Sequence, residues 1–220
     1  MQYLGLALYA EGKTDYRFLR PLLLRLCLSA CGRAVQPVDV GDVLELDHVG
    51  RLQNASRAEQ VAQAAQDAAP AWNILFVHAD ADGDAGRALR ERVVPGLDLV
   101  RGLGLARTEG VAVVPVRMTE SWVLADSDAL RAVFGTTLDD AALGLSLHGA
   151  ALERLADPKL TLDAAFAATR PTGQRARAGA TALLNALGEQ VALGQLQTLP
   201  SFRALEADLD TALRRLQILK

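Results

Sequence analysis

The sequence predicts an α/β fold: a Rossmann-like, mostly parallel sheet flanked by helices, with an all-helical C-terminal portion. Residues 3–9, 73–78 and 111–116 form short, nearly continuous apolar runs, which is typical of strands covered on both faces. Stretches with helical periodicity separate these runs, and this alternation indicates parallel strands joined by crossover helices. From about Ser127 onward only helical patterns follow.

Length and composition favour one large domain with a substantial appendage. The chain has 220 residues, of which 50% are hydrophobic, so a sizeable core can form. We expect an α/β domain at residues 1–126 and a helical region packed on it at residues 127–220. The formal net charge of −3 excludes nucleic-acid binding by bulk positive charge. Any DNA or RNA contact therefore needs a local patch, a metal or a partner protein.

The chain shows no sign of export or membrane insertion. Its first residues lack a basic region, and Glu11 interrupts the first apolar run, which is unlike a signal peptide. No apolar run is long enough to span a bilayer. Cys27 and Cys31 have the spacing of neither a redox pair nor a zinc site, so we expect two small buried side chains. These features predict a cytoplasmic protein with no membrane partner.

The first strand, residues 3–9, is predicted to stop at Glu11-Gly12. Thr14 is then expected to cap the following helix. Pro21 lies inside the helical pattern and predicts a kink or a late helix start. The apolar stripe of this helix is Phe18, Leu22, Leu26 and Ala30.

The next segment holds one or two short β-like runs within residues 35–48. Alternation over residues 43–47 predicts a half-exposed strand. Ser56 followed by Glu59 is typical of a capping box, and the helix that it opens should end before Pro70.

The strand at residues 73–78 leads directly into an acidic loop. The helix after this loop carries Arg87, Arg90 and Arg92 and is expected to end near Pro95-Gly96. The strand at 111–116 is followed at once by Met118-Thr119-Glu120-Ser121-Trp122, which should open a short helix. Ser201 is predicted to cap the last helix, whose apolar stripe is Phe202, Leu205, Leu209, Leu213 and Leu216.

Acidic residues collect at the carboxyl ends of three predicted strands. Glu11 follows the first strand, Asp80 and Asp82 follow the strand at 73–78, and Glu120 follows the strand at 111–116. In an open parallel sheet these ends lie at one edge, where ligands bind. We therefore expect these carboxylates to converge in space.

The Asp80-Ala81-Asp82 sequence suits a divalent cation. On an extended backbone, side chains two residues apart point the same way, so both carboxylates can face one ion. Mg²⁺ or Mn²⁺ would relieve their repulsion through oxygen ligands, and Gly83 permits a sharp turn. A purely structural alternative stays open, because strand-to-helix turns favour Asp and Gly and Asp84 can serve as an N-cap.

Other metal motifs share parts of this pattern. Asp80 to Glu91 has the acidic positions of a calcium EF-hand loop, but Ala85 stands where that loop needs glycine. The strand and Asp-x-Asp-Gly also resemble haloacid-dehalogenase phosphatases, although the pair Asp139-Asp140 precedes Lys159 instead of following it. Metal-dependent nucleotide-sugar transferases also carry Asp-x-Asp after a strand and remain an alternative.

Several motifs in order resemble the TOPRIM family. They are Glu11-Gly12-Lys13-Thr14-Asp15 with Phe18-Leu19, Asp80-Ala81-Asp82-Gly83, Glu120-Ser121-Trp122-Val123-Leu124-Ala125-Asp126, Asp157-Pro158-Lys159 and Pro200-Ser201-Phe202. TOPRIM domains carry a glutamate after the first strand and an Asp-x-Asp after a later one, which together bind Mg²⁺. The chain looks most like small bacterial TOPRIM-like, OLD-nuclease-related proteins that are encoded beside ATPases in phage-defence loci. Asp15 departs from the glutamate expected in many relatives.

The resemblance implies a metal-dependent nuclease acting on DNA or RNA. Glu11, Asp80, Asp82 and Glu120 would hold Mg²⁺ or Mn²⁺, with Glu11 alternatively handling the proton of the attacking water. Lys159 would steady the charge on the phosphate, or be an ordinary surface lysine. The alternative function is a non-catalytic docking or nucleic-acid-binding subunit for an ATPase partner. The oligomeric state is left open by the sequence.

Overall fold

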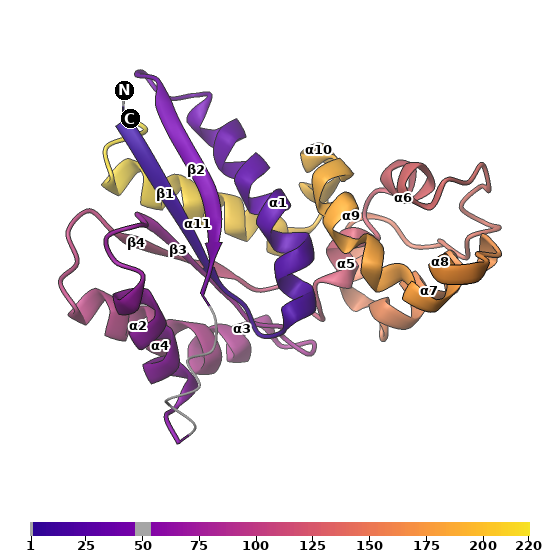
Figure 1. Ribbon diagram of the computed structural model, residues 1–220, viewed down its shortest axis with the longest axis horizontal. Coiled ribbons are helices and arrows are strands. Elements are labelled where there is room, and N and C mark those ends of the chain that lie inside the picture. The colour runs from indigo at the N-terminus through magenta and orange to yellow at the C-terminus, as the bar shows by residue number, and fades with distance from the viewer. Residues whose placement is uncertain (1, 47–53) are drawn as a thin grey trace.

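The computed structural model describes residues 2–46 and 54–220 and contains one parallel sheet of four strands (Figure 1). The strands are β1 (Gln2–Tyr9), β2 (Val38–Glu45), β3 (Ile74–His78) and β4 (Glu109–Val113). Their order across the sheet is β2-β1-β3-β4, and all three pairings are parallel. The predicted Rossmann-like α/β class is confirmed.

Parallel pairing brings the carboxyl ends of the strands to one edge of the sheet. In the central pair Leu6 lies opposite Ile74 and Tyr9 lies opposite Val77, so β1 and β3 finish almost level. His78 lies opposite Val113 at the end of β4. We call residues 10–15, 79–84 and 114–120, which follow these strands, the carboxyl edge. It contains every strand-end acid that the sequence singles out.

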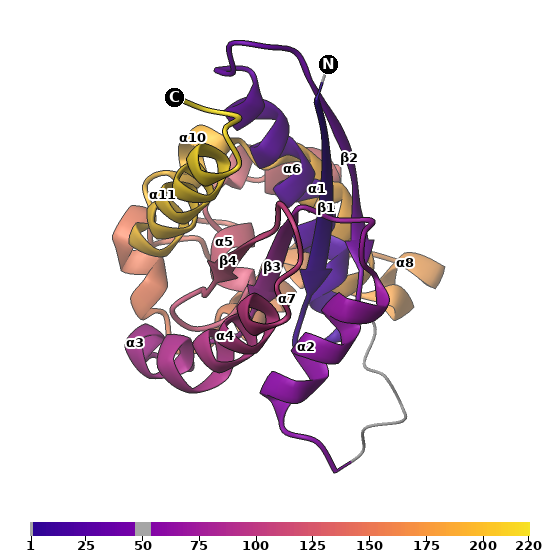
Figure 2. The same cartoon turned by 90° about the vertical axis from the view of Figure 1, so that its left-hand side faces the viewer.

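Helices cover both faces of the sheet (Figure 2). One face packs against α1 (Lys13–Cys31) and α11 (Pro200–Arg215). The opposite face packs against α2 (Arg57–Asp67) and α4 (Val94–Gly102). Successive strand residues alternate between these layers, so Leu6 and Leu8 face α1 while Ala7 and Tyr9 face α2. The last helix of the chain thus forms part of the α/β layers.

The remaining C-terminal elements form a helical lobe at the far end of the molecule from the sheet (Figure 1). As predicted, the described structure beyond residue 127 contains helices and no strand. The lobe consists of α5 (Glu120–Val123), α6 (Ser127–Phe134), α7 (Pro158–Ala168), α8 (Gly173–Ala178), α9 (Leu184–Gln190), α10 (Leu193–Leu196) and two 3₁₀ turns, Gly149–Arg154 and Ala180–Leu183.

Helix α9 joins the lobe to α1 through a close backbone contact. A side chain at Gly188 would lie 2.3 Å from the carbonyl oxygen of Phe18. Arg25 in α1 also donates a hydrogen bond to the Gly188 carbonyl, at 2.9 Å.

Among the described helices, none combines the length and apolar character that crossing a bilayer requires.

Helix α1 differs from the prediction at its start. Its N-cap is Gly12, and Thr14 already lies in the first turn, so the predicted Thr14 cap is wrong. The Asp15 side chain accepts the Gly12 N–H instead, at 2.9 Å. The helix continues through Pro21, so a late start is also wrong. Its predicted stripe is confirmed as buried, and Cys27 and Cys31 are buried and free. Burial raises the pKa of the Cys27 thiol.

The capping box of α2 is confirmed, because Ser56 and Glu59 exchange side-chain and backbone hydrogen bonds. The helix ends at Asp67, before Pro70 as predicted. The β-like runs of residues 35–48 form a single strand, β2. Its predicted alternation extends to Asp47, which lies outside the described residues together with positions up to 53.

The helix after the acidic loop does not end near Pro95. It comprises α3 (Ala85–Ala88), a π-helical turn (Leu89–Val93) and α4, which reaches Gly102. Pro95 stands in the first turn of α4, where its missing N–H is tolerated because the π turn has already shifted the hydrogen-bond ladder. The predicted end was therefore wrong.

Two further details at element ends differ from expectation. The predicted strand at 111–116 is β4 at Glu109–Val113, because the carbonyls of residues 115–117 bond to the acidic loop instead of a strand. Ser201 does not cap α11. The N-cap is Leu199, and the Ser201 hydroxyl accepts a hydrogen bond from Trp122 Nε1, at 2.8 Å.

Candidate metal centre

Elements that are far apart in the sequence meet at the carboxyl edge. Glu11 follows β1, and Asp15 lies in the first turn of α1. His78 is the last residue of β3 and Asp80 follows it closely. Glu120 begins α5, after the loop that leaves β4. The edge therefore gathers carboxylates from three strand ends, as the acidic pattern predicted.

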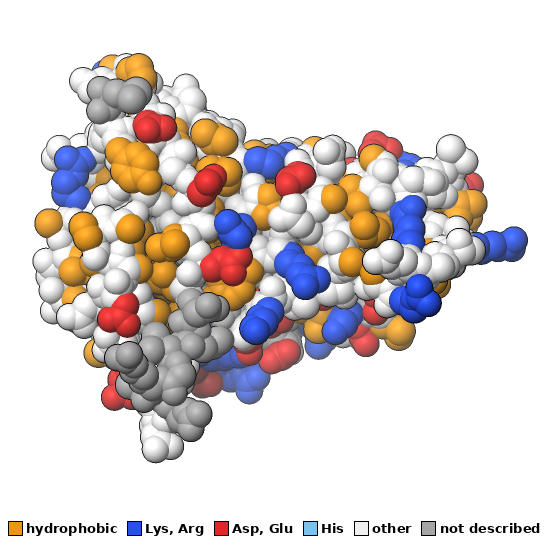
Figure 3. Space-filling view, in the orientation of Figure 1, with side chains coloured by type: hydrophobic (Ala, Val, Ile, Leu, Met, Phe, Trp, Pro, Cys, Tyr) orange, Lys and Arg blue, Asp and Glu red, His pale blue; other side chains and the backbone are white. Residues whose placement is uncertain are grey.

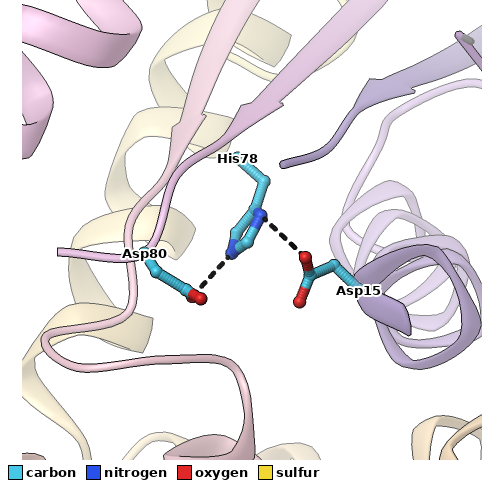
Figure 4. A group of neighbouring side chains, drawn as sticks. All are labelled: Asp15, His78 and Asp80. Carbon is cyan, nitrogen blue, oxygen red and sulfur yellow. Dashed lines mark ion pairs between the residues drawn. The ribbon is translucent and has the colours of Figure 1, made fainter. Parts of the chain in front are cut away.

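His78 lies between two carboxylates (Figure 4). Its side chain is fully buried, with Nδ1 3.8 Å from Asp15 Oδ2 and Nε2 3.2 Å from Asp80 Oδ1. The Glu11 backbone N–H points to Nδ1 at 3.5 Å. One ligand atom from each of Asp15, His78 and Asp80 lies within 4.8 Å of the others, the only such metal-ligand group in the part of the chain that the structure describes.

Asp80 Oδ1 is buried and lacks a hydrogen-bond partner among the described residues. His78 Nε2 is close, at 3.2 Å, but its orientation does not make a hydrogen bond to this atom. The neighbouring Thr119 hydroxyl donates to Asp15 Oδ1 instead, at 3.0 Å. An unsatisfied buried carboxylate oxygen is costly and rare. A cation bound here would satisfy it, so these residues fit a metal.

The pKa values of two acids reflect the crowding of negative charge. Burial raises the pKa of Asp15, and the charge of Asp80 raises it further, against the lowering influence of His78 and Thr119. Burial also raises the pKa of Glu120, with the charges of Asp80 and Asp15 acting in the same direction. Repulsion of this kind is what a hard divalent cation relieves.

Glu11 lies beside the metal-ligand group and has other partners. Its Oε2 accepts the Asp80 backbone N–H at 3.1 Å, and its Oε1 accepts a hydrogen bond from Arg92 Nη2. Arg92 Nη1 donates to the Asp80 carbonyl, at 2.7 Å. Glu11 therefore positions the backbone of Asp80 and holds a guanidinium.

Asp82 differs from the expectation that it faces the same way as Asp80 on extended backbone. Its φ of 51° is left-handed, and its side chain is 67% exposed. The N–H groups of residues 81–83 bond to carbonyls of residues 115–117, which imposes this turn. The only ion pair of Asp82 in the described structure is with Arg92 Nη1, at 3.6 Å. Gly83, with φ 97°, completes the sharp turn as predicted.

Two other predicted residues flank the group. Lys159 is exposed at the start of α7, and its charge lowers the pKa of Glu120, opposing the larger effect of burial. Asp84 is the N-cap of α3, where its side chain accepts the Arg87 N–H at 2.8 Å. Glu120 lies near Asp80 and Asp15 but outside the group of mutually close ligand atoms.

The sequence pattern does not assign Asp15 or His78 as metal ligands, and it does not place Arg92 among the catalytic residues. It places Asp15 in the Glu11–Asp15 motif and Arg92 in the helix after the acidic loop. A usable signal was present, because His78 ends the strand that leads into Asp80 and Asp15 lies one helical turn beyond Glu11.

Comparisons of the chain with protein-family models, with curated proteins and with solved structures gave no match. The chemistry of the site must therefore be argued from its own geometry.

Proposed function

We propose that the protein is a divalent-metal-dependent phosphodiesterase that cleaves DNA or RNA. One observation carries the proposal: partly buried carboxylates converge at the carboxyl edge, and the buried atom Asp80 Oδ1 has no hydrogen-bond partner in the described structure. Clustered carboxylates at the ends of parallel strands are suited to holding a metal where a substrate can reach it. The TOPRIM resemblance adds the phosphodiester substrate class.

Asp15, His78 and Asp80 are the residues that would hold the cation. Two carboxylates with one imidazole nitrogen suit Mn²⁺ at least as well as Mg²⁺, since the imidazole is the softer donor. A bound ion would supply an activated water and would neutralise charge that develops on the phosphate. Thr119 fixes the Asp15 carboxylate through its hydroxyl, so this ligand is already oriented.

Other residues of the chain would handle the proton and the phosphate. Glu120 has a raised pKa, so its carboxyl group can exchange a proton closer to neutral pH than an ordinary glutamate can. Arg117 lies over Gly83, with its guanidinium carbon 3.2 Å from where a β-carbon of residue 83 would stand. Together with Arg92 and Lys159 it supplies positive charge around the acids, which favours an anionic substrate.

The site offers few positively charged side chains for binding a nucleic-acid substrate. On the face seen in Figure 3, basic side chains lie singly over the middle and the helical end instead of forming a continuous patch. Duplex DNA binding normally needs several Lys or Arg contacts. We therefore propose that the purified protein cleaves nucleic acid only weakly. In the cytoplasm, an ATPase partner from a defence or DNA-processing system would supply the remaining contacts to the substrate.

A nicking assay tests the proposal. Plasmid DNA, single-stranded DNA and RNA are incubated with Mn²⁺ or Mg²⁺ and with wild type, Asp80→Asn, Glu11→Ala or the exposed control Asp98→Asn. We expect metal-dependent cleavage by wild type and the control, and a loss of at least about 100-fold in the two site variants. Cleavage that survives both site substitutions would exclude this site as its source.

A second function is favoured by one contact. Arg92 already pairs with Glu11, the residue expected to act on the proton of water. If Arg92 neutralises the Glu11 carboxylate, the protein would suit a docking or nucleic-acid-binding role that involves no catalysis. This alternative predicts metal-dependent binding of an oligonucleotide or of the ATPase partner, with no cleavage of any substrate in the assay.

A further inference from the structure

Arg92 occupies the position between two carboxylates that the sequence assigns to a metal. Its Nη2 donates to Glu11 Oε1, and its Nη1 lies 3.6 Å from Asp82 Oδ2. The same Nη1 donates to the backbone carbonyl of Asp80, at 2.7 Å. The Arg92 side chain is 29% exposed, so it is partly sheltered from solvent.

The fold holds Arg92 in this position through its backbone. Arg92 lies in the π-helical turn Leu89–Val93, and such turns change the direction in which a side chain points. Arg57 Nε donates to the Arg92 carbonyl at 3.1 Å, and its Nη2 donates to the His78 carbonyl at 2.6 Å. Arg57 also stacks 5.4 Å from the centre of the Tyr9 ring. The Arg92 turn is therefore tied to the end of β3.

Four acids of the carboxyl edge divide into two pairs with different partners. Glu11 and Asp82 pair with Arg92. Asp15 and Asp80 flank His78, and no arginine or lysine in the described structure forms an ion pair with either of them. An arginine side chain stays protonated at any pH that the protein tolerates. Glu11 and Asp82 therefore always have the positive charge of Arg92 beside them. Asp15 and Asp80 do not, so a bound metal ion is needed only there.

We propose that Arg92 takes the place of a second metal ion, so that the chain binds one divalent cation, at Asp15, His78 and Asp80. This inference rests on the proposed function. Two-metal phosphodiesterases use two ions to stabilise the attacking and leaving oxygens. Here the guanidinium held by Glu11 and Asp82 supplies the second positive charge and can donate hydrogen bonds to a phosphate oxygen. Arg92 is a positioning residue for Glu11 and a phosphate-facing cation.

The number of Mn²⁺ ions bound per chain tests the inference without measuring activity. Equilibrium dialysis of the full-length protein, with free Mn²⁺ followed by electron paramagnetic resonance, should give one ion for wild type and for the control Arg90→Gln. Arg92→Gln should bind two ions, since Glu11 and Asp82 lose their cation. The double variant Arg92→Gln with Glu11→Gln should return to one, and Asp80→Asn should bind none.

The outcomes separate the two proposals. Two ions on the wild-type chain, or an unchanged count in Arg92→Gln, would overturn the role of Arg92 and leave the proposed function standing. A wild-type chain that binds no Mn²⁺ would overturn both. If Arg92→Gln does not fold, Arg92→Met removes the same charge with a side chain of similar length, and its ion count decides the role of Arg92 in the same way.

Discussion

Two groups of sheltered polar side chains in the described structure, one at the carboxyl edge and one in the helical lobe, differ in how far their hydrogen bonds are satisfied. At the carboxyl edge, Asp15, His78 and Asp80 crowd together and Asp80 Oδ1 has no partner in the described structure. In the helical lobe, Asp126 and Glu153 are each only 6% exposed and accept hydrogen bonds from backbone N–H groups. Burial of an acid alone therefore does not mark a functional site. What distinguishes the carboxyl edge is the buried atom Asp80 Oδ1, which has no partner in the described structure.

The cluster at the lobe has a structural role that its hydrogen bonds explain. Asp126 Oδ1 accepts the Ala129 N–H at 3.0 Å as the N-cap of α6, and its Oδ2 accepts the Ala192 N–H at 2.8 Å. Glu153 accepts the Ser201 N–H at 2.8 Å. Asp126 therefore connects two segments of the lobe that are distant in sequence, and Glu153 connects the lobe to the start of α11. At the carboxyl edge, by contrast, neighbouring carboxylates repel one another, which lowers the stability of the fold. A bound cation would relieve this repulsion.

The largest stability effect should come from the lobe cluster. Asp126→Ala removes a helix cap and leaves the Ala192 N–H without its acceptor, so we expect a loss of roughly 2–4 kcal/mol in urea unfolding. Asp128→Ala, at an exposed position two residues away, should change stability by about 0.5 kcal/mol or less. In metal-free buffer Asp80→Asn should be at least as stable as wild type. A loss in Asp80→Asn equal to that in Asp126→Ala would remove the contrast between the clusters.

A smaller effect is expected at the indole of Trp122. This side chain is fully buried, packs edge-on against Phe202 with ring centres 5.3 Å apart, and donates to the Ser201 hydroxyl. Ser201→Ala leaves a buried N–H unsatisfied and should cost about 1–2 kcal/mol. Thermal melting followed by circular dichroism measures the change, and Ser29→Ala, on the exposed face of α1, serves as the control. An unchanged melting temperature in Ser201→Ala would show that the indole finds another acceptor.

The smallest effect concerns Glu120 and depends on pH. Because its folded pKa is raised, the protonated form is favoured by folding, and the charged form costs stability. This cost is absent below the ordinary pKa of glutamate, grows as pH rises through the raised folded value, and is then constant. Metal-free Glu120→Gln should therefore equal wild type in acid and exceed it at neutral pH by less than about 1 kcal/mol. The opposite trend would mean that Glu120 is stabilised as a carboxylate.

The fold class was predictable from the sequence because short apolar runs and helical stripes can be recognised within single segments of the chain. The strands at 3–9 and 73–78 are almost entirely apolar, and the stripe from Phe202 to Leu216 marks the last helix. The sequence did not reveal that this helix, α11, covers the same face of the sheet as α1. That contact depends on long-range packing, which no periodicity encodes.

The site was predictable only to the level of strand ends. Glu11, Asp80 and Glu120 follow strands, so their convergence follows from parallel topology. The direction of Asp82 and the approach of Arg92 could not be predicted. Asp82 takes its left-handed φ from bonds to residues 115–117, and Arg92 reaches Glu11 from a π-helical turn. Both features arise from tertiary contacts instead of local residue pattern.

We propose that the carboxyl edge is a metal site centred on Asp80. The most direct measurement is the shift in melting temperature on adding Mn²⁺ to the metal-free protein, compared between wild type, Asp80→Asn and the exposed control Asp98→Asn. At one hundred times the dissociation constant, binding should stabilise wild type and the control by about 2.7 kcal/mol, or roughly 5–10 °C. Asp80→Asn should show almost no shift. Equal shifts in wild type and Asp80→Asn would contradict the account, because the ion would then bind elsewhere.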